Sequence, residues 1–156
     1  MTVESTPTTP RPASTSGNLI PESQFGGKVV KTPLKQYFGR VAFSGGHDLS
    51  TLAVFDGRAD TAFVATHRFM NAIEASKGRM KVDDFNILWT STLIPQDPFV
   101  YRSTLCPEVK AQIAQTFLQL EQTPDGKKYL DNVDSDRFVS MKDSDYDVIR
   151  EAGGGK

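Results

Sequence analysis

Two short segments of the sequence combine hydroxyl, glycine and histidine residues in patterns typical of oxyanion binding. The first is Ser14-Thr15-Ser16-Gly17, which precedes Asn18-Leu19-Ile20, where a helix can begin. Helix N-termini expose backbone N–H groups that lack intrahelical partners and carry about half a positive charge, which suits an anionic oxygen. Three adjacent hydroxyls add donors for different oxygens of one tetrahedral group, and Gly17 lets the backbone approach it. The same pattern also fits an N-cap without any ligand.

The second segment is Ser44-Gly45-Gly46-His47-Asp48, which is predicted to be a strand end running through glycines into a helix. Backbone donors and a side chain converge at such a turn. His47 can donate a ring N–H to an oxyanion and, if protonated, adds a positive charge. The alternative is that His47 and Asp48 cap or pair at the start of the helix. The dinucleotide-binding pattern G-x-G-x-x-G is absent here.

Composition limits the classes of function. The chain has 156 residues, 38% of them hydrophobic, as expected for a globular domain, and 18 basic residues balance 19 acidic ones. This balance gives no electrostatic signature for nucleic acid or an anionic membrane, so any anion binding must be local. The lone Cys106 excludes an intramolecular disulfide, and no residue spacing indicates a metal site. The sequence also lacks a secretory signal, so we expect the signal of an exported form to lie outside it.

Three short apolar runs predict β-strands, at Arg40 to Ser44, Thr61 to Ala65 and Phe85 to Ser91. Leu49, Leu52 and Ala53 mark a helix ending near Asp56-Gly57, which would link the first two strands into a βαβ unit. The predicted fold class is therefore α/β.

Two helices are predicted further along. One begins at Pro107 and carries apolar residues at four-residue spacings, and a shorter one near Asp143 has Tyr146 and Ile149 on one face. Residues Met1 to Ala13, rich in Thr, Pro and Ser, are expected to be a disordered lead-in, and Gly153-Gly154-Gly155-Lys156 a flexible tail.

From Ser14 to about Gly153, the sequence resembles the second half of the phosphonate-, phosphate- or phosphite-binding periplasmic proteins of ABC transporters. Many short stretches match in a fixed order, which is more specific than any one of them. The matching stretches are Ser14-Thr15-Ser16-Gly17 with Ile20-Pro21, Tyr37-Phe38, Val41 to Asp48, Ala53-Val54, Gly57-Arg58-Ala59-Asp60, Ile87 to Ser91 and Leu93 to Pro98.

The resemblance implies a type II periplasmic-binding-protein lobe, a mixed sheet flanked by helices, truncated relative to the two-lobed family. Residues 14–152 would form the second lobe and, from about Phe69, segments that return to the first lobe. It implies that Ser14, Thr15, Ser16 and His47 contact the anion. Asp97 would face the rest of the ligand, although it also fits a turn before Pro98.

One departure from the family concerns the ligand. Members that accept an ammonium usually offer a carboxylate a few residues past the third strand, where this sequence has Ala65-Thr66-His67-Arg68. A protonated His67 is a poor partner for an ammonium, so a small ligand such as phosphite, methylphosphonate or phosphate is favoured over 2-aminoethylphosphonate. His67 equally fits an ordinary residue at a helix start.

The resemblance implies a solute-binding component of an ABC importer, periplasmic or extracytoplasmic, that binds its ligand without catalysis, metal or cofactor and pairs with a permease. Because the first lobe is missing, we expect weak binding by this chain alone and exposed apolar surface that promotes self-association. The alternatives are a ligand-sensing domain of a signalling protein and a non-functional fragment. An enzyme is disfavoured because adjacent His47 and Asp48 rarely orient each other and no G-x-S-x-G motif occurs.

Overall fold

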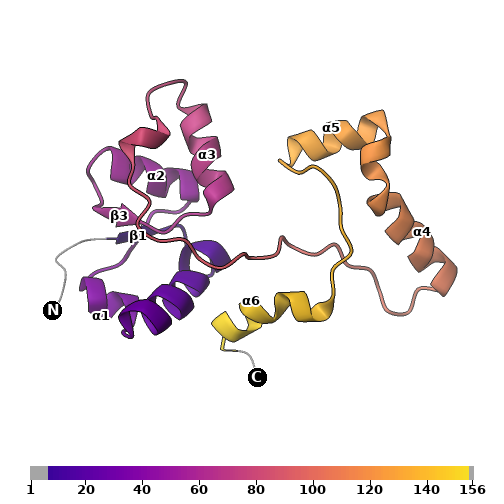
Figure 1. The fold of residues 1–156 in the computed structure, drawn as a ribbon, viewed down its shortest axis with the longest axis horizontal. Coiled ribbons are helices and arrows are strands. Elements are labelled where there is room, and N and C mark those ends of the chain that lie inside the picture. The colour runs from indigo at the N-terminus through magenta and orange to yellow at the C-terminus, as the bar shows by residue number, and fades with distance from the viewer. Residues whose placement is uncertain (1–6, 155–156) are drawn as a thin grey trace. The chain divides into compact units, whose positions relative to one another are not determined.

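The computed structural model describes residues 7–154, which divide into two compact units. Unit 1 contains the residues up to Ile94 and those from Tyr146 onward, and unit 2 contains Pro95–Asp145 (Figure 1). The helices and parallel strands confirm the α/β fold class. The chain is divided at Pro95, and Phe69 is buried in unit 1; the assignment of residues from about Phe69 onward to segments that return to a first lobe stays a prediction.

A three-stranded parallel sheet lies at the centre of unit 1, with the strand order β2-β1-β3. Its strands are β1 (Pro7–Thr9), β2 (Ala42–Phe43) and β3 (Thr61–Ala62). Thr8 pairs with Ala42 on one side and with Ala62 on the other. All described strands are parallel, so the sheet is not the mixed one expected. Because the strands are parallel, their carboxyl ends meet at one edge.

The central strand β1 contradicts the expected disordered lead-in. Met1 to Thr6 lie outside the described residues, but Pro7–Thr9 form this strand, and Thr8 and Thr9 are only 3% and 0% exposed. Threonine is β-branched and favours strands, and Pro7 occupies the first strand position, where proline is tolerated. Pairing with strands far along the chain orders a segment whose composition predicted disorder. As a result, β2 and β3 are separated by β1 instead of being neighbours.

Helices cover both sides of this sheet. Helices α2 (His47–Phe55) and α3 (Thr66–Ala75) pack against each other on one side, and α1 (Leu34–Phe38) lies on the other (Figure 1). The π-helices η1 (Thr15–Leu19) and η2 (Pro21–Val30) precede α1, and α6 (Asp147–Ala152) packs on them. The predicted helix through Leu49 is confirmed, and Gly57 follows it with a φ of 68°.

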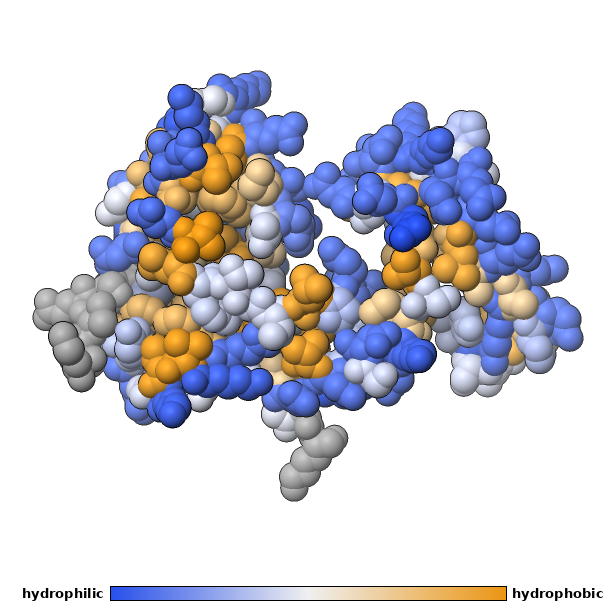
Figure 2. Space-filling view, viewed as in Figure 1, coloured by the Kyte–Doolittle hydropathy of each residue, from blue (hydrophilic) through white to orange (hydrophobic). Residues whose placement is uncertain are grey.

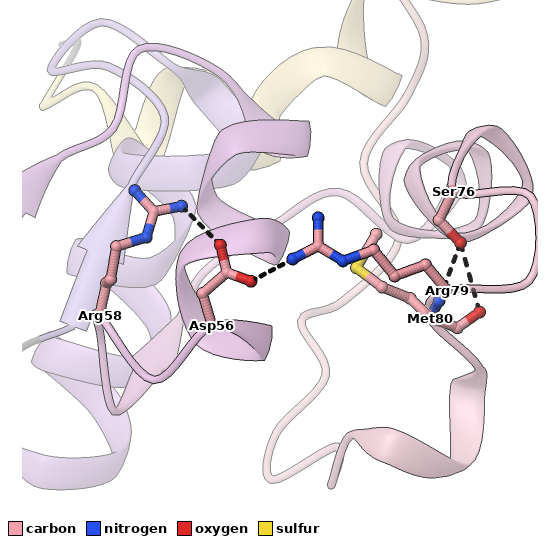
Figure 3. A network of polar contacts seen from close by, with 5 residues as sticks. All are labelled: Asp56, Arg58, Ser76, Arg79 and Met80. Carbon is pink, nitrogen blue, oxygen red and sulfur yellow. Dashed lines mark hydrogen bonds and ion pairs between the residues drawn. The ribbon is translucent and has the colours of Figure 1, made fainter.

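The ends of α2 and α3 are joined by a polar network on the surface (Figure 3). The Asp56 carboxylate accepts from Arg58 at 3.2 Å and from Arg79 at 2.7 Å, and the Arg79 guanidinium lies over the Phe55 ring. The Ser76 hydroxyl oxygen accepts from the Met80 N–H at 2.9 Å, which holds the turn that carries Arg79. Both arginines are largely exposed, so each ion pair contributes at most about 1 kcal/mol.

The predicted strand at Phe85 to Ser91 is wrong. This segment has no regular secondary structure and pairs with no strand among the described residues. It is held by side chains instead: the Trp89 ring lies 5.6 Å from Phe25 and 6.1 Å from Phe63, measured between centroids. The buried Gln24 amide exchanges two hydrogen bonds with Thr92, from Gln24 Nε2 to the hydroxyl at 2.7 Å and from the Thr92 N–H to Gln24 Oε1 at 3.0 Å.

Unit 2 is built from short helices around a small aromatic cluster. It contains α4 (Pro107–Leu118), η4 (Leu120–Gln122) and α5 (Pro124–Asn132), so the helix predicted from Pro107 is confirmed. The rings of Phe99, Phe117 and Phe138 lie 5.0 Å apart, centroid to centroid, in each pair.

The C-terminal helix predicted near Asp143 begins as a 3-10 turn, η5 (Asp143–Tyr146), and continues as α6. Gly153 and Gly154, expected in the flexible tail, donate backbone hydrogen bonds to Ile149 and Glu151 and so close α6; Gly155 and Lys156 lie outside the described residues. Between residues 7 and 154, none of the helices is long and apolar enough to cross a bilayer.

Both units expose large apolar side chains, as the hydropathy-coloured surface shows (Figure 2). The most exposed are Leu88 (82%) and Leu93 (96%) in unit 1 and Val100 (84%) in unit 2. Phe99 is also 60% exposed, in agreement with the general expectation of exposed apolar surface.

Candidate functional site

The carboxyl edge of the parallel sheet is the site of a surface depression in unit 1, with a volume of about 670 Å³. Each strand is followed by a segment that lines it. The segment after β1 supplies Arg11 and Ser14, the turn after β2 supplies Gly45 to Asp48, and α3, which follows β3, supplies Arg68 and Asn71. Ligands of open α/β sheets characteristically bind at this edge, where loops from neighbouring strands meet.

Ser14 is the N-cap of η1, and its hydroxyl oxygen accepts the Gly17 N–H at 3.1 Å. The capping interpretation of the serine-threonine segment is therefore confirmed. Capping and ligand binding are compatible, because a hydroxyl that accepts one hydrogen bond still has its own proton to donate. Ser14 lines the depression, so that proton is available to an acceptor bound there.

Thr15 and Ser16 occupy the first two positions of η1 and are half-buried. Among the described residues, Ser14 lines the depression and these two do not. Their role as anion contacts remains a prediction.

Gly17 has a different role from the one predicted, since it is buried against Pro10. A Cβ at Gly17 would lie 2.7 Å from Pro10 Cγ and 2.9 Å from Ser14 Oγ. The absent side chain allows η1 to pack on the segment after β1 and to hold Ser14 in place.

The turn after β2 brings His47 to the same depression. Gly45 has a φ of 98°, a conformation that a residue with a side chain rarely adopts, and its N–H bonds to Pro10 O at 2.8 Å. Gly46 is the N-cap of α2, and His47 is its first residue. Arg11 Nε, in the segment after β1, donates a hydrogen bond to Gly45 O at 3.0 Å and so stabilises the turn.

The imidazole of His47 is oriented by the backbone of another element. The Ala65 N–H, at the N-cap of α3, donates to His47 Nδ1 at 3.1 Å. A ring nitrogen that accepts a hydrogen bond carries no proton, so the neutral ring keeps its proton on Nε2. His47 is thus a donor through Nε2.

Burial lowers the pKa of His47 below its ordinary value, and the positive charges of His67 and Arg68 lower it further. The Asp48 carboxylate opposes these effects by raising the pKa. The ring is therefore neutral at pH 7, and it can contribute a hydrogen bond but no full positive charge. The sequence left open that a protonated His47 adds a positive charge, and the lowered pKa disfavours that form.

The two remaining predicted residues, His67 and Asp97, are not among the residues that line the depression. His67 is exposed in the first turn of α3 and is not among the residues that line the depression, although its charge acts on His47. Asp97 belongs to unit 2, in the extended segment that precedes α4, and its role as a ligand contact stays a prediction.

Arg68 lines the depression but was not predicted as a site residue. It occupies the third position of α3, one residue after His67. The strand order explains how it was missed: only after β1 is recognised between β2 and β3 do all three carboxyl ends point to one site. In the part of the chain that is described, no group of three or more metal-ligating side chains occurs.

The chain matches known proteins over nearly its whole length. A family model described as "ABC transporter, phosphonate, periplasmic substrate-binding protein" matches residues 5–146. The phosphonates-binding periplasmic protein of Escherichia coli K12 is 27% identical over 140 residues, covering 90% of this chain and 40% of that protein. The phosphate-import protein PhnD of Mycolicibacterium smegmatis is 31% identical over 112 residues, covering 69% of this chain and 35% of that protein.

A solved structure confirms the fold. The crystal structure of a binding protein component of an ABC phosphonate transporter from Pseudomonas aeruginosa superposes with a TM-score of 0.74 at 27% identity, covering 96% of this chain and 48% of that one. The chain thus spans about half the length of these relatives or less. With a match over residues 5–146 and this structural agreement, the chain belongs to the family of periplasmic substrate-binding proteins of ABC phosphonate transporters.

Proposed function

We propose that this chain contributes a phosphorus-oxyanion site to a solute-binding component of an ABC importer. The ligand class is phosphate, phosphite or a small phosphonate, captured reversibly with no bond made or broken. The protein acts in the periplasm or another extracytoplasmic space and delivers its ligand to a permease. The names of the relatives, one binding phosphonates and one importing phosphate, support this class.

One observation carries the proposal: the segments that follow two neighbouring parallel strands, β1 and β2, bring independent donors to one depression. Ser14 offers a hydroxyl proton after β1, and His47 offers Nε2–H after β2. The first N–H groups of the nine-residue α2 add backbone donors that have no intrahelical acceptors. Together these groups match the several oxygens of a tetrahedral oxyanion.

The depression is open to solvent on one side, and this weakens the binding expected from the chain alone. Water screens the attraction between the anion and its donors, and closure of a second wall over the ligand would remove that water. We therefore expect a dissociation constant in the millimolar range for this chain, roughly −4 kcal/mol.

The test is an NMR titration of the chain with phosphate, phosphite, methylphosphonate and 2-aminoethylphosphonate, with sulfate as a comparison anion. Shifts of the His47 ring and of the Gly45 and Gly46 amides should saturate with at least one phosphorus oxyanion. Ser14→Ala and His47→Ala should each weaken it about tenfold, because each removes one hydrogen bond to a charged group.

Ser135→Ala is the matched control, since Ser135 belongs to unit 2 and is not among the residues that line the depression. Binding that is unchanged by both site substitutions, or the absence of saturable shifts with every phosphorus oxyanion, would contradict the proposal. Breakdown of any phosphonate, followed by phosphorus NMR, would contradict capture without catalysis.

A further inference from the structure

We propose that Arg68 is a ligand-binding residue of this depression, and that its guanidinium makes the site prefer a compact phosphorus oxyanion over an aminoalkylphosphonate. This inference rests on the proposed function and names the ligand class that the same site favours.

The position of Arg68 at the start of α3 brings it to the depression. Arg68 lies in the first turn of α3, three residues after Ala65, whose N–H binds the His47 ring. Arg68 lines the depression together with Ser14 and His47. The hydrogen bond between Ala65 and His47 therefore ties the start of α3, which carries Arg68, to the turn that carries His47.

The charge of Arg68 has no partner among the described residues. A cation in the first turn of a helix is opposed by the helix dipole, and α3 has no acidic residue in that turn. Within residues 7–154, no hydrogen bond or ion pair involves the Arg68 side chain, which is exposed. An anion bound in the depression would supply the missing partner.

Two other charged residues, Arg11 and Asp48, line the depression. Arg11 uses Nε to hold Gly45 O, so its guanidinium serves the turn. Asp48 lies in the first turn of α2, where a carboxylate is favourable, and its Oδ1 is 2.5 Å from the position that a Gly46 Cβ would take. Asp48 is folded back on its own helix start and forms no ion pair with Arg68. Two guanidinium groups therefore face one carboxylate around the depression.

The chemistry of the guanidinium explains the preference. Its planar fork donates two parallel hydrogen bonds to two oxygens of a phosphate or phosphite, which a point charge such as lysine cannot do. The ammonium of 2-aminoethylphosphonate has the same sign as Arg68 and is repelled when it lies close by. Arg68 therefore favours the compact anion on both counts.

The experiment compares Arg68→Gln, Arg68→Lys and Arg40→Gln with the unmodified chain, titrated with inorganic phosphate and with 2-aminoethylphosphonate by NMR. Arg40 is exposed and outside the depression, so Arg40→Gln is a control with the same change in net charge. We expect Arg68→Gln to bind phosphate more weakly by a factor of about ten or more, because the loss of even one of the two charge-assisted hydrogen bonds has an effect of about that size. Arg68→Lys should bind with intermediate affinity, and Arg68→Gln should lose most of the preference for phosphate.

A readout without ligand separates this inference from the proposed function. The pKa of His47, followed by its ring shifts, should rise in Arg68→Gln because a neighbouring positive charge is removed, and should not change in Arg40→Gln. Equal phosphate binding in Arg68→Gln and Arg40→Gln refutes the role of Arg68 while leaving the proposed function standing. Failure of the unmodified chain to bind any phosphorus oxyanion refutes both proposals, whatever the His47 pKa does, because a rise in that pKa shows only that Arg68 lies near His47.

Discussion

Replacing Gly17 by alanine tests whether close packing of η1 on the segment after β1 positions Ser14. The new Cβ would lie 2.7 Å from Pro10 Cγ and closer still to Pro10 Cδ, and 2.9 Å from Ser14 Oγ. The ring of Pro10 cannot rotate out of the way, so the backbone must shift. Overpacking of this kind typically costs about 1–3 kcal/mol, which here exceeds the small gain of alanine over glycine in a helix.

The matched control is Gly27→Ala in η2. Gly27 is exposed, and the nearest atom to a Cβ added there would be Glu22 O at 3.8 Å, an ordinary contact. Alanine there should stabilise the chain by roughly 0.5–1 kcal/mol, because it lowers the backbone entropy of the unfolded state. The two variants change the same atoms and should differ in sign.

Urea unfolding followed by tryptophan fluorescence measures this difference. Trp89 is the one tryptophan of the chain, and it packs on Phe25 and Phe63 in unit 1, so its emission reports on the unit that contains Gly17. With a typical urea dependence of about 1–3 kcal/mol per M, a loss of about 2 kcal/mol lowers the midpoint by roughly 1 M. A Gly17→Ala midpoint equal to or above that of Gly27→Ala would refute the packing argument.

Three further predictions follow from contacts in the structure. The pKa of His47 is lower in the folded chain than in the unfolded chain, so the unfolded chain binds the proton first as pH falls. The free energy of unfolding should therefore be highest above about pH 6.5 and decrease as pH drops toward the folded pKa. In His47→Gln the urea midpoint should depend less on pH. Gln24→Ala removes both bonds to Thr92 and should cost about 1–3 kcal/mol with a red-shifted Trp89 emission, whereas the exposed Gln36→Ala should change neither. The exposed Leu88, Leu93 and Val100 should promote self-association, so the mass measured by light scattering should rise with protein concentration. At a given concentration this mass should be lower in Leu88→Ser and in Val100→Ser. A chain that is monomeric at all concentrations refutes this prediction.

Local pattern was sufficient for the elements whose stability is decided nearby. The four-residue spacing after Pro107 and the left-handed glycine after α2 predicted helices that the structure contains. The two candidate oxyanion-binding segments, Ser14 to Gly17 and Ser44 to Asp48, were also identified from the sequence, because they combine hydroxyls, glycines and a histidine at predicted strand and helix ends. Of the predicted contacts, Ser14 and His47 line one depression.

The features that the local sequence pattern did not predict depend on pairing between strands that are far apart in the chain. Pro7–Thr9 is too short and too polar to predict a strand, yet it is buried because β2 and β3 arrive on either side from distant parts of the chain. The apolar run from Phe85 to Ser91 makes no strand because no described neighbour pairs with it, and aromatic contacts hold it instead. The same physics governs the site: Ser14, His47 and Arg68 are far apart in the chain, and the order β2-β1-β3 places them at one edge. The local sequence thus shows which residue types can bind an oxyanion, whereas strand pairing between distant segments brings those residues together in one site.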